Sequence, residues 1–582
     1  MRAVQRVLTG SAESWDGIIL TLFSFKGDQT AVDPAIGWPF AYLNIDFAGE
    51  RDLAMAKSAK DRITTKAPTR QMWRRSVVII AVLLLFCVGL LGKLSVIQIA
   101  QADFWRERAV EQQMHDSPTS PKRGAIYDSK MTVLAQSATV WTIIMSPKSI
   151  KSEDMRVKIA DELSELLEVD RDKLYKKTLK VNSQYEIVKA KIEHPLVETL
   201  SKWIQKNKLT GVLRAIEDYK RYYPLNNLAS EVLGFTGTDN NGLYGLEAHY
   251  EKTLAGKPGR IVTAKNGWGD DLDVKLKFEK TIEAQDGNGL VLTIDSVVQY
   301  YAEKYLEIAV KETGCTNRGL VIVMETDTGA ITAMATKGDF DPNEPMTITD
   351  PTLQAQIALL AGDERSAAIK KAREEQWVNK PISDFYEPGS VFKTFTAAMA
   401  LEEGRIKDSW RYYCSGKLVV VPGTKAVKCH KYGGHGSQTF AQAISNSCNP
   451  AFMTVGLDLG KNLFFKYFQG FGFTERTGID MLSESKVTDL LYHDEKELGP
   501  MQLAVSSFGQ TFKVTPIQMI TAMSAVANGG RLMQPYVVQQ VLDGGGNVIK
   551  NTEPIIKRQV VSESSASRLN KMLADSVNGG GA

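Results

Sequence analysis

One uncharged apolar stretch constrains this chain more than any other feature. Residues 76–92 read SVVIIAVLLLFCVGLLG, and the apolar segment LSVIQIA follows after a single lysine, Lys93. Together they are long enough for a helix to cross a hydrocarbon core of about 30 Å, provided that the Lys93 ammonium reaches the interface. The sequence therefore predicts a single N-terminal transmembrane helix over residues 76–100.

The charges before this stretch predict its orientation. Basic residues gather just ahead of it, namely Lys57, Lys60, Arg62, Lys66, Arg70, Arg74 and Arg75. Because positive charge is retained in the cytoplasm, we expect a cytoplasmic basic tail at residues 55–75 and an extracytoplasmic region after about residue 100. A cleaved signal peptide has the same order of charges, but the apolar run is long and no convincing small-x-small site follows it.

Residues 1–54 match no structural pattern and form an uncertain N-terminal extension. They contain Trp and Phe but lack clear periodicity, and Met55 opens the basic tail. Our hypothesis is that translation begins at Met55. N-terminal sequencing that finds Met1 would contradict it.

The rest of the chain has the size and composition of globular domains. A length of 582 residues is too great for one compact domain. With 24% charged and 43% apolar residues, wholesale disorder is excluded. The formal net charge of +3, with Lys- and Arg-rich stretches that are short and mixed with acids, gives no reason to expect a nucleic-acid partner.

The pattern of elements changes near Asp286, where we place a domain boundary. Before it, residues 120–137 alternate like strands on both sides of a turn, and residues 150–210 contain amphipathic helices. After it, Asp295 is a candidate N-cap, and short β-branched strands mix with helices. We expect a multidomain α+β or α/β protein, with one domain at 101–285 and another at 286–582.

The sharpest chemical signal is the segment EPGSVFK, residues 387–393. Ser390 should lie in the first turn of a helix, and Lys393, three positions on, should share its face. A neutral lysine can take the proton of a serine hydroxyl, and the helix start offers N–H groups to developing negative charge. Alone, S-x-x-K is weak, because a solvated helix start often has the same residues.

A second segment strengthens the first. Ser447-Cys448-Asn449 lies between two helix-like runs and offers a hydroxyl for proton relay and an amide to hold a substrate peptide. Ser445 is a weaker candidate, because Ser445-Asn446-Ser447 lacks the final Asn. Standing alone, this triplet would be read as ordinary polar loop residues.

Together the two motifs resemble the S-x-x-K and S-x-N pair of penicillin-binding proteins and serine β-lactamases. From about residue 70 onward the chain is similar to class B penicillin-binding proteins, especially division- and sporulation-type enzymes of Gram-positive bacteria. The blocks that carry the resemblance include RGAIYD (123–128), GLYGLE (242–247), LTID (292–295), HGSQTF, FGFTERTGID and FGQTFKVTPIQM. The chain departs from the family at residues 129–131, Ser-Lys-Met, where an Arg-Asn-Gly-like turn is usual.

The resemblance implies both a fold and an activity. We expect an elongated, dimerisation-like pedestal at residues 101–285, and at 286–582 a transpeptidase domain whose antiparallel sheet is sandwiched by helices. The activity would be peptidoglycan D,D-transpeptidation, inhibited by β-lactams. Ser390 would be acylated, Lys393 would be the general base, Ser447 would relay the proton and Asn449 would bind substrate.

The same resemblance implies partners. They are peptidoglycan stem peptides, the cell membrane, a lipid II polymerase and other cell-wall synthesis proteins. We expect no cofactor and no metal.

One family motif, K-[ST]-G, does not occur in the sequence. Arg476-Thr477-Gly478 comes too soon after Ser447 to replace it. Since the chain ends at NGGGA, we expect a C-terminal truncation before this motif and an impaired or inactive enzyme. Loss of one oxyanion-hole donor alone costs about 10²–10³ in kcat.

Two other functions are weighed against this one. A β-lactamase or β-lactam sensor would share acylation at Ser390, but a simple β-lactamase needs no pedestal. A non-catalytic cell-wall scaffold would not need Ser390 and Lys393.

The cysteines raise a separate question. They are Cys87, Cys315, Cys414, Cys429 and Cys448. Cys414 and Cys429 flank a predicted hairpin, and His430 and His435 follow closely, which makes zinc conceivable. The spacing matches no standard zinc finger, so we expect a disulfide or two free thiols instead.

Overall fold

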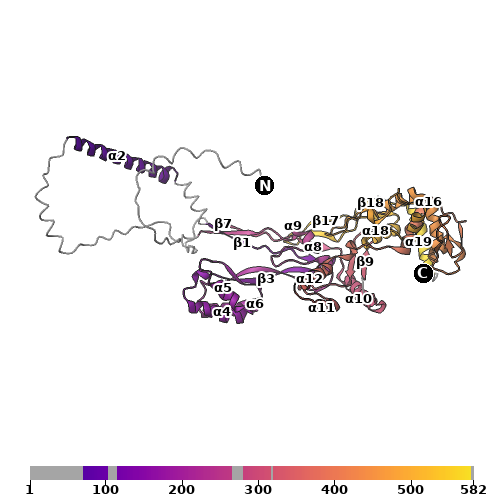
Figure 1. Cartoon of the computed structure of the whole chain (residues 1–582), viewed down its shortest axis with the longest axis horizontal. Coiled ribbons are helices and arrows are strands. Elements are labelled where there is room, and N and C mark those ends of the chain that lie inside the picture. Colours follow the sequence, from indigo (N-terminus) through magenta and orange to yellow (C-terminus); the bar gives the residue numbers. More distant parts are fainter. Residues whose placement is uncertain (1–69, 102–113, 265–279, 316–318, 579–582) are drawn as a thin grey trace. The chain divides into compact units, whose positions relative to one another are not determined.

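The computed structural model describes residues 70–101, 114–264, 280–315 and 319–578 (Figure 1). The predicted extension at residues 1–54 and most of the predicted tail at 55–75 lie outside the described residues. The chain divides into two compact units, residues 1–107 and 108–582.

The first unit contains one long apolar helix. α2 (Arg70–Ser95) continues into a π-helical turn, η2 (Val96–Ala100). Within them, Trp73–Ile99 has a mean hydropathy of 2.8 over 27 residues, which by length and composition makes it a candidate membrane span. α2 includes residues 70–75, which were predicted to belong to the basic tail.

A seven-stranded mixed sheet organises the second unit. Six strands follow the order β17-β16-β8-β2-β3-β4, and β5 pairs with β3. The pair β2–β8 is parallel, whereas the other pairs are antiparallel. The strands are β2 (Ile126–Tyr127), β3 (Val133–Met145), β4 (Glu186–Ile192), β5 (Leu213–Tyr222), β8 (Gly289–Leu292), β16 (Val538–Leu542) and β17 (Val548–Asn551).

The predicted strand–turn–strand at residues 120–137 is confirmed. The turn between β2 and β3 is held by Asp128, whose Oδ1 accepts the N–H groups of Lys130 at 2.9 Å and Thr132 at 2.7 Å. Its Oδ2 accepts the hydroxyl of Ser296 at 2.6 Å. At the tip, Met131 has a left-handed φ of 67°, which is the position where the family usually has glycine.

Three helices cover one end of β3, as Figure 1 shows. They are α4 (Glu153–Leu167), α5 (Arg171–Thr178) and α6 (His194–Lys206), and they fall in the region predicted to hold amphipathic helices. Side chains of Ser152 and Asp170 cap α4 and α5. The apolar faces of the helices enclose a core with β3 and β4 that includes Ile143, Ile159, Leu163, Val188 and Leu200.

The segment between β5 and β8 contains short elements. Strands β1 (Met114–Thr119), β6 (Gly259–Ala264) and β7 (Lys280–Ile282) form an antiparallel sheet in the order β1-β6-β7. The short helices are α7 (Ser230–Leu233), α8 (Gly245–His249) and α9 (Glu251–Leu254).

The GLYGLE and RGAIYD blocks meet at a buried carboxylate. Glu247 in α8 accepts Arg123 Nε at 2.5 Å and Arg221 Nε at 2.6 Å, and the three side chains are almost completely inaccessible. Arg221 also donates to the carbonyl oxygen of Gly124 at 2.8 Å. Glu247 therefore connects the segment before β2 with β5 through buried ion pairs.

After β8, Asp295 caps the long helix α10 (Ser296–Thr313), accepting the N–H groups of Val297 and Val298, as predicted. α10 packs against the antiparallel pair β9 (Leu320–Met324) and β10 (Ile331–Thr336), while α18 (Pro516–Ala527) contacts β9 and β15 (Arg531–Met533). β15 pairs with β18 (Ile556–Gln559). Three further helices are α11 (Pro351–Ala358), α12 (Gly362–Trp377) and α13 (Lys380–Ser383).

The remaining helices enclose an aromatic core. They are α14 (Lys393–Glu402), α15 (Phe440–Ser445), α16 (Asn449–Gly470), α17 (Pro500–Ser506) and α19 (Glu563–Asn578). Phe392 lies at the centre of this core, with its ring centroid 4.7 Å from that of Phe512 and 5.4 Å from those of Phe395 and Phe473. The buried Phe392 side chain thus anchors the turn that carries Ser390 to the aromatic core.

The predicted hairpin between Cys414 and Cys429 is also present. β12 (Lys417–Leu418) pairs with β13 (Val427–Lys428), and the flanking strands β11 (Arg411–Cys414) and β14 (Gly436–Thr439) pair with each other. The segment from β11 to β14, residues 411–439, leads directly into α15.

Candidate active site

Ser390 lies in a single 3-10 turn, η4 (Gly389–Phe392), that continues as α14. The expected helix start is therefore present, with a tighter first turn than an α-helix has. Ser390 is exposed, whereas Phe392, two positions on, is completely buried. The hydroxyl is thus accessible from solvent on a turn that the aromatic core holds in place.

Lys393 brings the predicted site residues together. Its Nζ lies 3.0 Å from Ser390 Oγ, 2.9 Å from Ser447 Oγ and 2.6 Å from Asn449 Oδ1. The carbonyl oxygen of Ser447 is a fourth neighbour, at 2.7 Å. Residues separated by more than fifty positions in the sequence thus converge on one nitrogen.

Counting hydrogens shows what this arrangement can do. The carbonyl oxygen of Ser447 and the amide Oδ1 of Asn449 only accept hydrogen bonds, so they take two N–H groups of the lysine. A charged ammonium gives its third N–H to a serine hydroxyl. A neutral amine instead presents a lone pair, which can accept the hydroxyl proton of Ser390 or Ser447.

Burial favours the neutral form of Lys393. Its side chain is 4% exposed, and this desolvation lowers the pKa of Lys393 to about 8, although Cys448 and Cys429 act in the opposite direction. The face of the Phe452 ring lies 5.8 Å from Nζ. A lysine with this pKa has a substantial neutral fraction near neutral pH, as a general base requires.

The loop that carries Ser447 and Asn449 has a defined conformation. Ser447 has a left-handed φ of 45°, and its N–H donates to the carbonyl oxygen of Ile444 at 2.9 Å. The N–H of Cys448 donates to the carbonyl oxygen of Ala443 at 3.0 Å. These bonds end α15 and direct the first residue of α16, Asn449, toward Lys393.

Sequence reasoning gave no role to Gly509, which supports the nucleophile turn. Its carbonyl oxygen accepts the N–H of Gly389 at 2.9 Å, and its φ is +87°. A Cβ at this position would lie 2.0 Å from the carbonyl oxygen of Gly389. The only sequence signal was its place in the FGQTFKVTPIQM block.

The Arg476-Thr477-Gly478 segment forms hydrogen bonds with the Glu484 carboxylate. Thr477 donates both its N–H, at 2.6 Å, and its hydroxyl, at 2.7 Å, to Glu484 Oε1, and Gly478 N–H donates to Oε2 at 3.1 Å. These bonds give a physical reason for not treating it as a substrate-binding strand.

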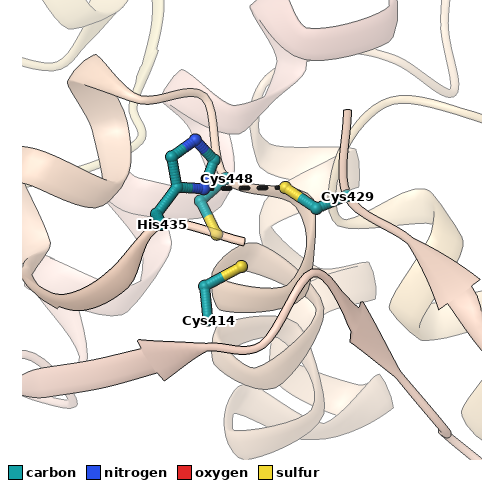
Figure 2. A group of neighbouring side chains, drawn as sticks. All are labelled: Cys414, Cys429, His435 and Cys448. Atoms are coloured by element: carbon teal, nitrogen blue, oxygen red, sulfur yellow. Dashed lines mark hydrogen bonds between the residues drawn. The ribbon is translucent and has the colours of Figure 1, made fainter. Parts of the chain in front are cut away.

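The structure also gathers a group that the sequence did not predict as a whole. Sγ atoms of Cys414, Cys429 and Cys448 and a ring nitrogen of His435 all lie within 4.8 Å of one another (Figure 2). The three thiols are free, rather than paired in the disulfide that was one expectation. Cys448, the middle residue of the S-x-N triplet, was not connected with the other cysteines.

Geometry thus places an exposed serine hydroxyl beside a buried lysine and a second hydroxyl. Two family models match the same chain. Residues 118–292 match the penicillin-binding protein dimerisation domain, and residues 319–582 match the penicillin-binding protein transpeptidase domain.

Curated relatives agree with the family models. Stage V sporulation protein D of Bacillus subtilis is 32% identical over 479 residues, which cover 82% of this chain and 68% of that protein. Peptidoglycan D,D-transpeptidase FtsI of Escherichia coli is 23% identical over 500 residues, covering 84% and 76%. The chain therefore belongs to the penicillin-binding protein family and has its dimerisation and transpeptidase domains.

Solved structures share the fold. A peptidoglycan synthetase from Bifidobacterium adolescentis superposes with a TM-score of 0.60 at 22% identity, covering 80% of this chain and 82% of that one. Penicillin-binding protein PBP2 from Helicobacter pylori, solved in a complex with MreC, gives 0.61 at 21% identity, covering 80% and 83%. The two-domain fold expected from the sequence is confirmed, and the strand pairs β9–β10 and β15–β18 of the transpeptidase domain are antiparallel, as expected.

Proposed function

We propose that this chain is a peptidoglycan D,D-transpeptidase that works through an acyl-enzyme at Ser390. The observation that carries the proposal is the position of Lys393 Nζ, within 3.0 Å of the Ser390, Ser447 and Asn449 side-chain oxygens. The relatives named peptidoglycan D,D-transpeptidases support the choice of substrate.

In the acylation step, Ser390 Oγ attacks the carbonyl carbon of the penultimate D-Ala of a stem peptide. Neutral Lys393 accepts the hydroxyl proton, and Ser447 passes a proton to the departing amine of the terminal D-Ala. Asn449, whose Oδ1 is held by Lys393, directs its amide N–H groups to the backbone of the substrate. The peptide bond breaks as the Ser390 ester forms.

In the second step, an amine from a neighbouring stem attacks the ester. Lys393 and Ser447 transfer the proton that the attacking amine loses to Ser390 Oγ, so the ester bond breaks, the enzyme is regenerated and an amide cross-link is made. A β-lactam acylates Ser390 in the same way, but its leaving group stays attached, so the adduct persists.

We further propose the arrangement of the chain at the membrane. Residues 55–75 form a cytoplasmic basic tail, 76–100 an anchor, 101–285 the pedestal and 286–582 the extracytoplasmic catalytic domain. Basic residues before the apolar helix support this orientation. The partners are a lipid II polymerase and other cell-wall synthesis proteins, a choice supported by the neighbour solved in a complex with MreC.

Orientation is tested with alkaline phosphatase, which is active only outside the cytoplasm. Alkaline phosphatase fused after residue 582 should be active, whereas phosphatase fused directly after residue 75, in place of the rest of the chain, should be inactive. The reverse pattern would contradict the proposed topology.

Catalysis is tested by intact mass of the full chain in detergent after incubation with benzylpenicillin, with Ser390→Ala as the control. We expect a single stable penicilloyl adduct that the control lacks. Rapid loss of the adduct would favour a β-lactamase. No adduct on a folded chain would overturn the proposal for this chain and would favour either a scaffold or an enzyme impaired by the missing K-[ST]-G motif.

A further inference from the structure

Residues 411–439, the β11–β14 segment, carry positive charge without any negative charge. Residues 409–457 contain neither Asp nor Glu, although 67 of the 582 residues of the whole chain are acidic. The β11–β14 segment contains five basic residues, all of them exposed: Arg411, Lys417, Lys425, Lys428 and Lys431. Because these residues are spaced along the segment, they form no Lys-rich run in the sequence.

These five cations have no acidic partner in the part of the chain that the structure describes. Arg411 donates to backbone carbonyl oxygens, and no described carboxylate lies within ion-pair distance of any of the four lysines. Other exposed lysines do have such partners. On α12, for example, Lys370 lies 3.8 Å from Glu374, and Lys371 lies 3.8 Å from Glu375. The described chain therefore leaves the positive charge of the β11–β14 segment uncompensated.

Two of the lysines lie directly opposite each other in the hairpin formed by β12 and β13. Lys417 is the register partner of Lys428, and the next pair is Leu418 with Val427. Residues directly opposite in an antiparallel pair have Cβ atoms about 4.5–5.5 Å apart, and two like charges there destabilise the pair. Because side chains alternate between the faces of a strand, Leu418 and Val427 face the protein, whereas both lysines face solvent. The hairpin thus keeps a repulsive contact on its outer face.

The inner face of this hairpin packs on the elements that hold the candidate active site. Its partly buried side chains contact three buried residues, Met453, Ala504 and Phe508. Met453 belongs to α16, the helix whose first residue is Asn449. Phe508 precedes Gly509, whose carbonyl oxygen accepts the N–H of the residue before Ser390. The basic outer face is therefore separated by one hydrophobic layer from the elements that carry the site.

A ligand with carboxylates fits this face. An ammonium group only donates hydrogen bonds, and a carboxylate only accepts them, through two oxygens. One carboxylate can therefore bind Lys417 and Lys428 together, which removes their repulsion. The segment also exposes the rings of Tyr413 and Tyr432, which offer apolar surface to a ligand. Cations together with exposed rings suit an acidic peptide better than a polyanion without apolar groups.

We propose that the outer face of the β11–β14 segment, with its Lys417–Lys428 pair, is a docking surface for an acidic peptide, namely a stem peptide with free carboxylates. The choice of peptide rests on the proposed function, which brings stem peptides to Ser390. The lysines attract the peptide and hold it beside the site, and they take no part in making or breaking bonds. Attraction between exposed charges is strongest at low ionic strength. Stem peptides whose carboxylates are amidated are therefore poorer ligands.

The first experiment measures binding without catalysis, on the full-length Ser390→Ala chain in nonionic detergent. The probe is a fluorescent synthetic stem pentapeptide with a free glutamate carboxylate, and the comparison is the same peptide with that carboxylate amidated. By fluorescence anisotropy, the free acid should bind about fivefold more tightly at low salt, and the difference should fall below about twofold at high salt. Equal affinities for both peptides, unchanged by salt, would overturn the proposal.

A pair of double variants locates the surface. Lys417→Gln with Lys428→Gln removes two positive charges from the hairpin and should abolish the preference for the free acid. Lys370→Gln with Lys371→Gln is the matched control, because it removes the same charge from α12, where each lysine has a glutamate partner. The control should bind both peptides as the parent does. Equal losses in the two double variants would show that only the net charge of the chain matters, which contradicts a docking surface.

A single substitution separates binding from folding. Lys428→Glu places opposite charges across the hairpin, so the thermal midpoint of unfolding should stay the same or rise. The affinity for the free-acid peptide should nevertheless fall by about fivefold or more, because the carboxylate of the peptide now meets a carboxylate of the protein. A variant that lost stability and affinity together would show that Lys428 serves the fold, and the proposal would be wrong.

A competitor tests the choice of a peptide as the ligand. A short glycerol-phosphate oligomer with the same net charge as the peptide should displace the probe less well than unlabelled peptide does. Stronger displacement by the oligomer would assign the surface to a phosphate polymer and overturn the proposal. The proposed function fails separately, through a missing penicilloyl adduct at Ser390 on the wild-type chain. An adduct found together with salt-insensitive peptide binding would reject the docking surface alone.

Discussion

In the proposed mechanism, the protonation state of Lys393 determines when Ser390 can react. Its nitrogen has two partners that only accept hydrogen bonds, so the lone pair becomes available to a hydroxyl only after the ammonium has lost a proton. Burial lowers the pKa of Lys393 to about 8, whereas in the unfolded chain it would titrate near its ordinary value.

We therefore predict that benzylpenicillin acylation of Ser390 accelerates as the pH is raised through about 8 and then levels off, because only the neutral amine accepts a proton. Lys393→Arg keeps a positive charge at every accessible pH. It should lower the rate by about 10²–10⁴-fold and remove the rise. Stopped-flow or quenched mass spectrometry across pH 6–10 measures both profiles, and a flat wild-type profile would exclude Lys393 as the base.

Glu247 is a residue whose contribution is to stability. It is completely buried and faces two guanidinium groups, those of Arg123 and Arg221. We predict that Glu247→Gln lowers the free energy of unfolding by about 3–5 kcal/mol, because the buried Arg221 loses its counter-charge and the buried Arg123 keeps only the partly exposed Glu251. Glu251→Gln is the matched control, since Glu251 also pairs with Arg123, at 2.7 Å, but is partly exposed. Denaturant midpoints compare them, and an equal cost for both would contradict the burial argument.

At the scale of elements, the nucleophile turn η4 depends on a close approach from the segment after α17. Gly509 meets Gly389 backbone to backbone, at a φ that disfavours any side chain. We predict that Gly509→Ala displaces the turn and slows acylation by about 10²-fold, while Gly544→Ala, where an added Cβ has no neighbour within 4 Å, has no effect. Rates at one β-lactam concentration suffice, and an unchanged Gly509→Ala rate would show that η4 does not need this contact.

Elements were predictable where the signal was local. Helical spacing related Ser390 to Lys393, and the two helix-like runs expected on either side of the S-x-N triplet are α15 and α16. The cysteine–histidine group was not predictable, because only Cys414 lies in a strand and the proximity of the four side chains depends on tertiary packing. The role of Gly509 was not predictable for the same reason, since the sequence does not show that the backbone of Gly389 lies against this glycine.

At the scale of the whole second unit, the two family domains share one sheet. β8 follows the predicted boundary at Asp286, yet it pairs on one side with β2 and on the other with β16. Ile126, Leu290 and Val538 also lie in one hydrophobic core. The boundary predicted at Asp286 marks a change of composition, but the same sheet and the same hydrophobic core extend to both sides of it.

Because the sheet is continuous, we predict that a destabilising substitution in β2 also destabilises strands of the transpeptidase domain. Ile126 and Ile159 are both 0% exposed, but Ile126 lies in the shared core and Ile159 in the separate core under α4–α6. Truncating either to Ala should cost about 2–5 kcal/mol. We expect Ile126→Ala to increase deuterium uptake in β8 and β16, because both depend on β2, whereas Ile159→Ala should increase it only in α4–α6 and the strands that they cover. If β16 exchanged at the wild-type rate in Ile126→Ala, or equally fast in both variants, the shared sheet would not be one cooperative unit.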